Sequence, residues 1–139
     1  MLFQIVHVPI DPSLLQRQLA NEEAGACVTF EGWVRRHNDG HAVQALEYEA
    51  YEELANKEGL KILEEACEKF GILNVIAVHR VGLLRLGETA VWVSVTAAHR
   101  DAAFAGCRYV IDEIKARVPI WKKEHYESGS TEWINCAKP

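Results

Sequence analysis

The sequence predicts an α+β fold in which helices pack on an antiparallel sheet. Three observations lead to this prediction: long segments with apolar residues at helical spacing, several segments rich in β-branched and aromatic residues, and no repeated alternation of strand and helix. With 139 residues, of which 49% are hydrophobic, the chain can bury its own core. We therefore expect residues 1–139 to form a single domain.

A short helix is expected near the N-terminus, over residues 12–20. Pro12 suits its first turn, and Asp11 before it can cap the helix N-terminus. The residues that follow are of different types. Because β-branched and aromatic side chains dominate 26–35 and recur in 43–51, we expect a strand in each of these segments.

These two strands are predicted to pair as a hairpin, because Asn38, Asp39 and Gly40 stand between them as turn residues. A hairpin implies antiparallel pairing, so it favours an α+β fold over a doubly wound sheet. Within the first strand, Gly32 suggests a bulge or a close approach of another backbone.

A second helix is predicted over residues 52–70, with Gly71 where a helix C-cap is expected. Further strands are predicted at 73–81 and 90–97, joined by a loop that carries two glycines. The apolar side of the helix is expected to hold Leu60, Leu63, Cys67 and Phe70. One face of the second strand is expected to hold Val91, Val93 and Val95.

The last predicted helix begins at Asp101, which can cap its N-terminus, and ends before Pro119. Its apolar residues are spaced by three and four positions, which is typical of an amphipathic helix. They are Phe104, Cys107, Ile111, Ile114 and Val118.

Charge and cysteine usage limit the classes of function. The formal net charge is -5 and the sequence pI is about 5.7, so any anion site must be local and a polyanion such as DNA is not an expected partner. The four cysteines lack C-x-x-C spacing, which suggests reduced thiols and a cytoplasmic protein. We expect no signal peptide and no membrane span, because the N-terminus has no basic region and no apolar run approaches ~20 residues.

Lysines cluster around the end of the last predicted helix. Lys115 lies at the edge of its apolar side, and Lys122 and Lys123 follow shortly after it. Lysines near a helix C-terminus often only complement the helix dipole. A lysine partly surrounded by Trp121 and its apolar neighbours could instead act as an acid, a base or a nucleophile, and the pattern does not choose between these readings.

His99 and Arg100 stand where a strand hands over to a helix N-terminus. Backbone N–H groups and the helix dipole favour a bound anion at such a position, and both side chains add hydrogen-bond donors. The alternative is that His99 bonds a loop carbonyl and Arg100 is solvated. On position alone, this is the best candidate for an anion site.

Arg35 and Arg36 end the first predicted hairpin strand. Neighbouring strand residues point to opposite faces, so at most one of the two arginines should face a shared pocket. The histidines and cysteines have no ligand-like spacing, so no metal site is expected, and no glycine-rich phosphate loop is present.

Several segments together resemble the family of molybdopterin synthase large, catalytic subunits. The resemblance covers the chain from about residue 24 to 126, and the segments occur in the order found in that family. The last of them is specific enough to identify the family almost unaided. The segments are Gly-Ala-Cys-Val-Thr-Phe-Glu-Gly-Trp-Val-Arg (25–35), Leu-Glu-Tyr-Glu-Ala-Tyr (46–51), His-Arg-Val-Gly (79–82), Ala-His-Arg (98–100) and Ile-Lys-Ala-Arg-Val-Pro-Ile-Trp-Lys-Lys-Glu (114–124).

The resemblance implies a sulfurtransferase of molybdenum cofactor biosynthesis with an α/β-hammerhead-like fold. Two such subunits form a homodimer, and each receives the Gly-Gly tail of a small ubiquitin-like sulfur carrier with a thiocarboxylate, giving a heterotetramer. The substrate is cyclic pyranopterin monophosphate, which gains the dithiolene of molybdopterin. No cofactor and no metal are implied for the chain itself.

The resemblance also implies roles for individual residues. Lys115 and Lys122 correspond to the two active-site lysines of the family. The substrate-binding residues it implies are Trp33, Val34, Arg35, His99, Arg100, Lys123 and Glu124. A thiocarboxylate is already a nucleophile, so we expect Cys27, Cys67 and Cys107 to be core residues, whereas Cys136 near the end of the chain is expected to be exposed.

The sequence is also compatible with two non-catalytic functions. The same arginines and lysines could form a non-catalytic module that binds a nucleotide or a phosphorylated metabolite. The chain could also be a scaffold subunit that only docks a ubiquitin-like partner. Both readings predict that substitution of a single lysine removes no chemical step.

Overall fold

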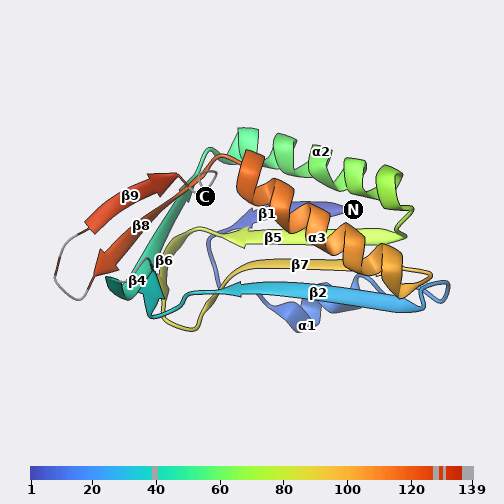
Figure 1. Cartoon of the computed structure of the whole chain (residues 1–139), viewed down its shortest axis with the longest axis horizontal. Helices are drawn as coiled ribbons and strands as arrows, with labels where there is room; N and C mark the ends of the chain where they lie inside the picture. Colours follow the sequence, from blue (N-terminus) through green and yellow to red (C-terminus); the bar gives the residue numbers. More distant parts are fainter. Residues whose placement is uncertain (39–40, 127–128, 130, 136–139) are drawn as a thin grey trace.

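The computed structural model describes residues 1–38, 41–126, 129 and 131–135. Two sheets meet at an angle, and helices lie on both faces of the first sheet (Figure 1). This arrangement confirms the predicted α+β class. The turn residues Asp39 and Gly40, and also Cys136, lie outside the described residues.

The first sheet has four strands in the order β1-β5-β7-β2. The pair β1 and β5 is parallel, and the other pairs are antiparallel. At one edge of this sheet lies β2, which pairs within the sheet only with β7. The strands are β1 (Leu2–Val6), β2 (Ala26–Trp33), β5 (Asn74–Arg80) and β7 (Thr89–Ala97).

Helices α2 (Glu52–Phe70) and α3 (Arg100–Arg117) cover one face of this sheet, and the short α1 (Pro12–Arg17) lies on the other. Alternation along β7 explains the two layers. Val91, Val93 and Val95 pack against α2 and α3, as predicted, whereas Trp92 packs against α1.

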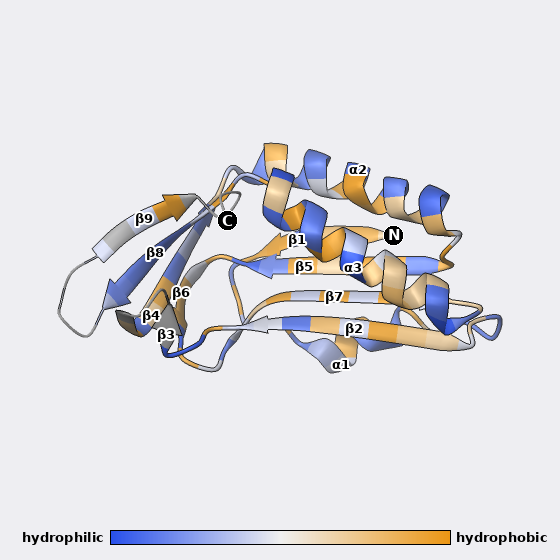
Figure 2. Cartoon of the chain, in the orientation of Figure 1, coloured by the Kyte–Doolittle hydropathy of each residue, from blue (hydrophilic) through white to orange (hydrophobic). Residues whose placement is uncertain are grey.

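The second sheet is built around β4 (His41–Ala50), which pairs with three other strands. Figure 2 shows that β4 and β8 are more hydrophilic than the strands of the first sheet. The remaining strands are β3 (His37–Asn38), β6 (Gly82–Arg85), β8 (Ile120–Tyr126) and β9 (Thr131–Asn135).

Short connections and a shared core hold the two sheets together. Val81 alone separates β5 of the first sheet from β6 of the second. Ile120 of β8 belongs to the same core cluster as the valines of β7, and Tyr48 of β4 packs against it. Residues on β4, β5 and β8 are therefore held in a fixed relation where the sheets meet.

Local signals correctly predicted the start of α1, the end of α2 and the bulge in β2. The Asp11 side chain accepts a hydrogen bond from the Leu14 N–H, and Gly71 ends α2 with a φ of 64°. A register shift follows Gly32, where an added Cβ would lie 2.7 Å from a methyl group of Val91. Asp101 is not the cap: α3 begins one residue earlier, and its N-cap is His99, which makes no side-chain cap hydrogen bond.

The predicted hairpin between 26–35 and 43–51 is wrong, because β2 pairs with β7 and leaves the sheet at Trp33. Only the two residues of β3 pair back onto β4. The first predicted helix ends at Arg17 rather than at residue 20. The strands β1, β6, β8 and β9 were not predicted from the sequence.

The predicted apolar sides of the helices need correction at one position each. Leu60 of α2 is 42% exposed and Phe104 of α3 is 60% exposed, because small residues on the sheet side let each helix lie close to the strands. The small residues are Ala55, Gly59 and Ala66 of α2, and Ala103 and Gly106 of α3. Among the cysteines, Cys107 is buried and Cys67 half-buried, but Cys27 is exposed, which contradicts its assignment to the core.

Candidate functional site

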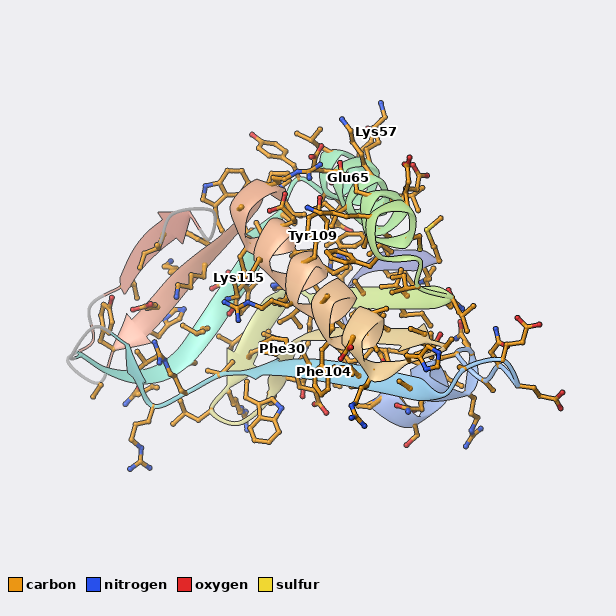
Figure 3. All side chains as sticks on the ribbon, turned by 45° about the vertical axis from the view of Figure 1, so that its right-hand side comes forward. Phe30, Lys57, Glu65, Phe104, Tyr109 and Lys115 are labelled. Atoms are coloured by element: carbon orange, nitrogen blue, oxygen red, sulfur yellow. The ribbon has the colours of Figure 1, made fainter. Side chains whose placement is uncertain are left out.

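The two predicted lysines lie on different elements near the junction of the sheets. Lys115 is exposed in the last turn of α3, and Figure 3 shows its side chain on the side of the second sheet. Lys122 lies on β8, directly opposite Tyr48 of β4 in the antiparallel register. Residues opposed in this way share one face of the sheet, so Tyr48 and Lys122 are side-chain neighbours.

Tyr48 connects this strand pair to His79 of β5. The two rings meet edge to face, with their centroids 5.0 Å apart. Lys115 acts electrostatically on the same histidine. Lys122 is thus a neighbour of Tyr48, and Lys115 is close enough to His79 for its charge to act there.

His79 is buried and held in one orientation. Its Nδ1 lies 2.8 Å from the carbonyl oxygen of Arg80, and since a carbonyl can only accept, Nδ1 carries the proton and Nε2 keeps its lone pair. Burial lowers the pKa of His79 from 6.5 to about 4, the Arg80 hydrogen bond opposes this shift, and the charge of Lys115 adds to it. At neutral pH the imidazole is uncharged.

Glu124 lies on the same face of β8 as Lys122, two residues further on. Its Oε1 is 3.3 Å from the Nζ of Lys122, and its side chain is 2% exposed. The structure thus places this predicted substrate contact inside the sheet packing, next to one of the predicted catalytic lysines.

Lys123 points to the other face of β8. Its Nζ lies 5.4 Å from the ring centre of Trp133 on β9, a cation–π contact. On the same side, His125 contacts Glu47 of β4 at 3.4 Å. Strand alternation therefore separates Lys123 from Lys122, although both were predicted to serve one site.

A pocket of about 510 Å³ opens at the N-terminus of α3, lined by Gly25, Ala98, His99, Arg100 and Asp101. His99 and Arg100 are exposed there, as predicted from their position. Because His99 makes no side-chain cap hydrogen bond, the first-turn N–H groups are not capped by this residue. An added Cβ at Gly25 would lie 2.4 Å from the Ala98 oxygen, so a glycine keeps this loop against the strand end.

The pocket at His99 and Arg100 lies far from the lysines of the same chain. Arg100 and Lys115 stand at opposite ends of α3, about 22 Å apart at 1.5 Å per residue. Within one chain the structure separates His99 and Arg100 from the predicted catalytic lysines. It also separates them from Arg35, which follows the opposite end of β2.

The three predicted residues that follow the bulge differ in exposure. Trp33 is 66% exposed, and its indole N–H donates to Glu31 over 3.2 Å. Val34 is buried, and its backbone makes two hydrogen bonds with the turn before β7. The Val34 N–H donates to the Glu88 carbonyl oxygen, and the Gly87 N–H donates to the Val34 carbonyl oxygen. Arg35 is exposed. Val34 therefore holds this segment in place, while its neighbours face outward.

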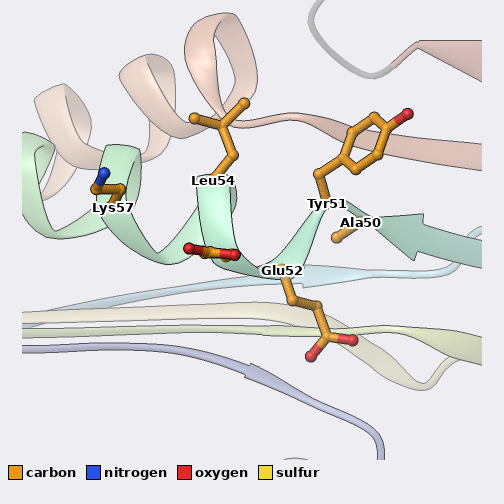
Figure 4. A pocket seen from close by; sticks show the side chains of 6 residues that line it. Ala50, Tyr51, Glu52, Leu54 and Lys57 are labelled. Atoms are coloured by element: carbon orange, nitrogen blue, oxygen red, sulfur yellow. The ribbon is translucent and has the colours of Figure 1, made fainter.

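A second cavity, of about 560 Å³, lies where β4 leads into α2 (Figure 4). It is lined by Tyr51, Leu54 and Lys57 together with Ala50, Glu52 and Glu53, none of which the sequence singled out. The Tyr51 ring lies 5.4 Å from that of Trp121, edge to face. None of its lining residues belongs to the group of Lys115, Lys122, Tyr48 and His79, which we call the lysine site.

Sequence reasoning did not single out Tyr48 and His79. The signal for His79 was its place at the start of the His-Arg-Val-Gly segment, directly after a run of buried strand residues. Across the described part of the chain, no group of three or more His, Cys, Asp or Glu side chains is arranged to hold a metal ion. No helix in the same residues is long and apolar enough to cross a membrane.

Comparisons with known proteins match most of the chain to one family. Residues 5–117 match the family model of the MoaE protein. The molybdopterin synthase catalytic subunit of Thermoplasma volcanium is 46% identical over 130 residues, which cover 94% of this chain and 95% of that protein. The corresponding subunit of Synechococcus elongatus is 41% identical over 131 residues, covering 92% of this chain and 79% of that protein.

Solved structures lead to the same family. The crystal structure of molybdopterin synthase from Staphylococcus aureus superposes with a TM-score of 0.89 at 39% sequence identity, covering 96% of each chain. Both the family model and the relatives match most of this chain, and the fold agrees over nearly all of it. The chain therefore belongs to the MoaE family, the family of molybdopterin synthase catalytic subunits.

Proposed function

We propose that this chain transfers sulfur from the thiocarboxylated C-terminus of a small carrier protein to cyclic pyranopterin monophosphate, forming the dithiolene of molybdopterin. The single observation that carries the proposal is the placement of Lys115 and Lys122 around Tyr48 and His79, in a family of molybdopterin synthase catalytic subunits. In each transfer the acyl carbon of the carrier exchanges its sulfur for an oxygen. The two lysines are assigned to the chemical step.

The charges suit this reaction. Sulfur transfer develops negative charge on a thiolate and a carboxylate, and cations placed in advance stabilise such charge. Lys115 and Lys122 supply these cations at the junction, and neutral His79 adds no competing charge beside Lys115. A thiocarboxylate is itself the nucleophile, which fits the absence of any described cysteine from this cluster.

The phosphate of the substrate is assigned to the N-terminus of α3. Arg100 and His99 provide donors there, beside the start of β2, whereas Trp33 and Arg35 are exposed at the other end of that strand. Since α3 keeps Arg100 about 22 Å from Lys115, one chain cannot offer both groups to one small substrate. We assign the missing part to a second copy.

The edge of β2 is the surface we assign to the dimer. Phe30 of β2 and Phe104 of α3 are exposed on this side and lie near each other (Figure 3). A two-fold axis across this edge would run the two copies of α3 in opposite directions, so that the first turn of one lies toward the last turn of the other. Arg100 of one copy would then complete the lysine site of its neighbour.

Two coarser expectations also become part of the proposal. Ile120 of the second sheet lies in the core of the first, which supports the view that residues 1–139 act as one domain. The described cysteines are free thiols, which supports a cytoplasmic protein.

Reconstitution tests the proposed reaction. The purified chain, the thiocarboxylated carrier and the pterin precursor are mixed, and dithiolene formation is followed. A carrier that ends in an ordinary carboxylate is the negative control. We expect product with the parent chain and little with Lys115→Ala or Lys122→Ala. Normal turnover by both variants would refute the assignment of the two lysines, whereas no product with the parent chain would favour the scaffold or the anion-binding module.

A further inference from the structure

The ion pair between Lys122 and Glu124 has very unequal exposure. The Nζ of Lys122 lies 3.3 Å from Oε1 of Glu124, and the lysine side chain is 24% exposed whereas the glutamate side chain is 2% exposed. The lysine therefore reaches the surface of the site, while its counter-ion stays inside the protein. A molecule bound in the site can touch the ammonium more readily than the carboxylate.

Apolar and aromatic residues neighbour Glu124 in the sheet. Leu46 lies directly opposite it on β4, and Ile120 and Tyr126 share its face of β8. Leu46 and Ile120 are both buried. A carboxylate is costly to bury in such surroundings unless cations or hydrogen-bond donors accompany it, so a glutamate at this position needs a reason beyond packing.

Strand alternation gives that reason. Residues 122 and 124 project from the same face of β8, so a Lys-x-Glu sequence places the carboxylate beside the ammonium without any change of backbone. Lys123, between them, projects to the other face and rests on Trp133. Of these two adjacent lysines, the one beside the buried carboxylate is the one assigned to the chemical step.

We propose that Glu124 is a positioning residue, which holds the ammonium of Lys122 in the site and does not itself contact the pterin substrate. This inference rests on the proposed function of Lys122. It differs from the role implied by resemblance, in which Glu124 belongs to a stretch that contacts the substrate.

The kinetic test uses Glu124→Gln, which keeps the size of the side chain and removes its charge. We expect kcat to fall by about tenfold to a hundredfold, because a misplaced catalytic group loses most of its effect, while KM for the pterin stays within about twofold. In a Lys122→Ala background, Glu124→Gln should cause no further loss. A higher KM with unchanged kcat would overturn the inference, because it would mean direct substrate contact.

The matched control is Glu47→Gln. Glu47 also lies in the second sheet and also pairs with a β8 side chain, His125 at 3.4 Å, but this pair is half-exposed on the opposite face. Its substitution should leave kcat and KM as in the parent. An equal loss of kcat in both variants would show that any charge removed from this sheet has the same effect.

A labelling experiment separates this inference from the proposed function. Brief treatment with an acylating reagent, followed by mass spectrometry of the peptide that carries Lys122 and Lys123, gives the labelling ratio of the two lysines without any substrate. We expect Glu124→Gln to raise the Lys122 share severalfold, because the ion pair occupies the Lys122 amine and holds it in place. An unchanged ratio would overturn the positioning role, even if Lys122 proves essential for turnover.

A raised labelling ratio in Glu124→Gln together with normal turnover by Lys122→Ala would support the ion pair but refute the proposed role of Lys122 in the reaction. Thermal unfolding of each variant checks folding. If Glu124→Gln does not fold, Glu124→Asp serves in its place. Aspartate keeps the charge, but its side chain is one methylene shorter, so the ammonium of Lys122 would be held in a different position. A reduced kcat with parental KM is expected for it, and parental values of both would contradict the inference.

Discussion

Arg117 Nη1 lies 2.6 Å from Oε1 of Glu65, and this ion pair joins the last turn of α3 to the middle of α2. The guanidinium also contacts Glu58 of α2 and Glu113 of α3, and the Tyr109 hydroxyl donates to Glu65 (Figure 3). The hydrogen bond from Arg117 is the main reason that the pKa of Glu65 falls from 4.5 to about 2. The two helices are thus clamped together above the sheet, next to the helix turn that carries Lys115.

We expect Arg117→Ala to lower the free energy of unfolding by about 2 kcal/mol at pH 7, because three carboxylates lose a shared cation. Urea denaturation measures the change. Arg108→Ala is the control, since its pair with Asp112 is largely exposed and should contribute less than about 0.5 kcal/mol. Equal losses in the two variants would mean that the clamp does not stabilise the fold.

The Arg117 effect should depend on pH in a defined direction. A carboxyl whose pKa is lowered by folding stabilises the protein above its unfolded pKa and loses this contribution as the pH falls toward the folded value. The difference between parent and Arg117→Ala should therefore shrink between pH 4.5 and about 2. A constant difference over this range would contradict the assignment of the shift to Arg117.

His79 should make the fold sensitive to mild acid. Its pKa is 6.5 in the unfolded chain and about 4 in the folded one, so the unfolded state binds more protons between these values. Stability is then full above pH 6.5, and about 3 kcal/mol of it is lost as the pH falls from 7 to 4. His79→Phe keeps a ring against Tyr48 and should remove this part of the pH dependence in urea denaturation. Parallel curves for parent and variant would exclude His79 as its source.

Mixing two impaired variants at a substrate concentration well below the parent KM tests whether two copies share the site. Arg100→Ala damages the phosphate contact, and Lys115→Ala damages the chemical step. If the residues come from different copies, random exchange gives half mixed dimers with one intact site each, and activity should return to about a quarter of the parent value. If the subunits do not exchange, or if all residues of a site come from one chain, the mixture shows only the average activity of the two variants. Mass spectrometry of differently labelled subunits verifies the exchange.

Arg100 should matter more for substrate phosphate than Arg36. Arg100 lies at the N-terminus of α3, where helix N–H groups assist it, whereas Arg36 is an exposed residue in the loop after β2. Calorimetry with the pterin phosphate should show binding weakened by about tenfold, or about 1.4 kcal/mol, in Arg100→Ala and by much less in Arg36→Ala. Equal affinities would place the phosphate elsewhere.

The helices were predictable because their signals are local. Capping by Asp11, the left-handed glycine at 71 and the spacing of apolar residues act within a few turns. Pairing partners were not predictable in the same way. The turn residues at 38–40 predicted a hairpin with 26–35, but the β-branched side chains of β2 find their partner on β7, more than fifty residues away. Pairing over such distances depends on the whole core.

The C-terminal strands escaped prediction for a different reason. The segment Lys122 to His125 has four charged or titratable residues in succession, whereas strands usually show alternating apolar side chains. Burial of Glu124 beside Lys122 reverses the usual pattern at a position that we assign to the proposed site. The two lysines were candidates from their position in the sequence and from the resemblance, but their neighbours Tyr48 and His79 come from strands that only the folded chain brings to them.

The open edge of β2 also bears on how a newly made chain survives until it is assembled. An unpaired strand edge can template association with any extended polypeptide, and fibrous aggregates grow in this way. The bulge after Gly32 breaks the regular register at one end of β2, and the exposed carboxylate of Glu31 stands beside it. Both features oppose indiscriminate pairing along the strand, because a flat and uncharged edge is what such growth requires. The bulge and the charge at the end of β2 therefore reduce the risk of aggregation that comes with leaving this edge unpaired for one specific partner.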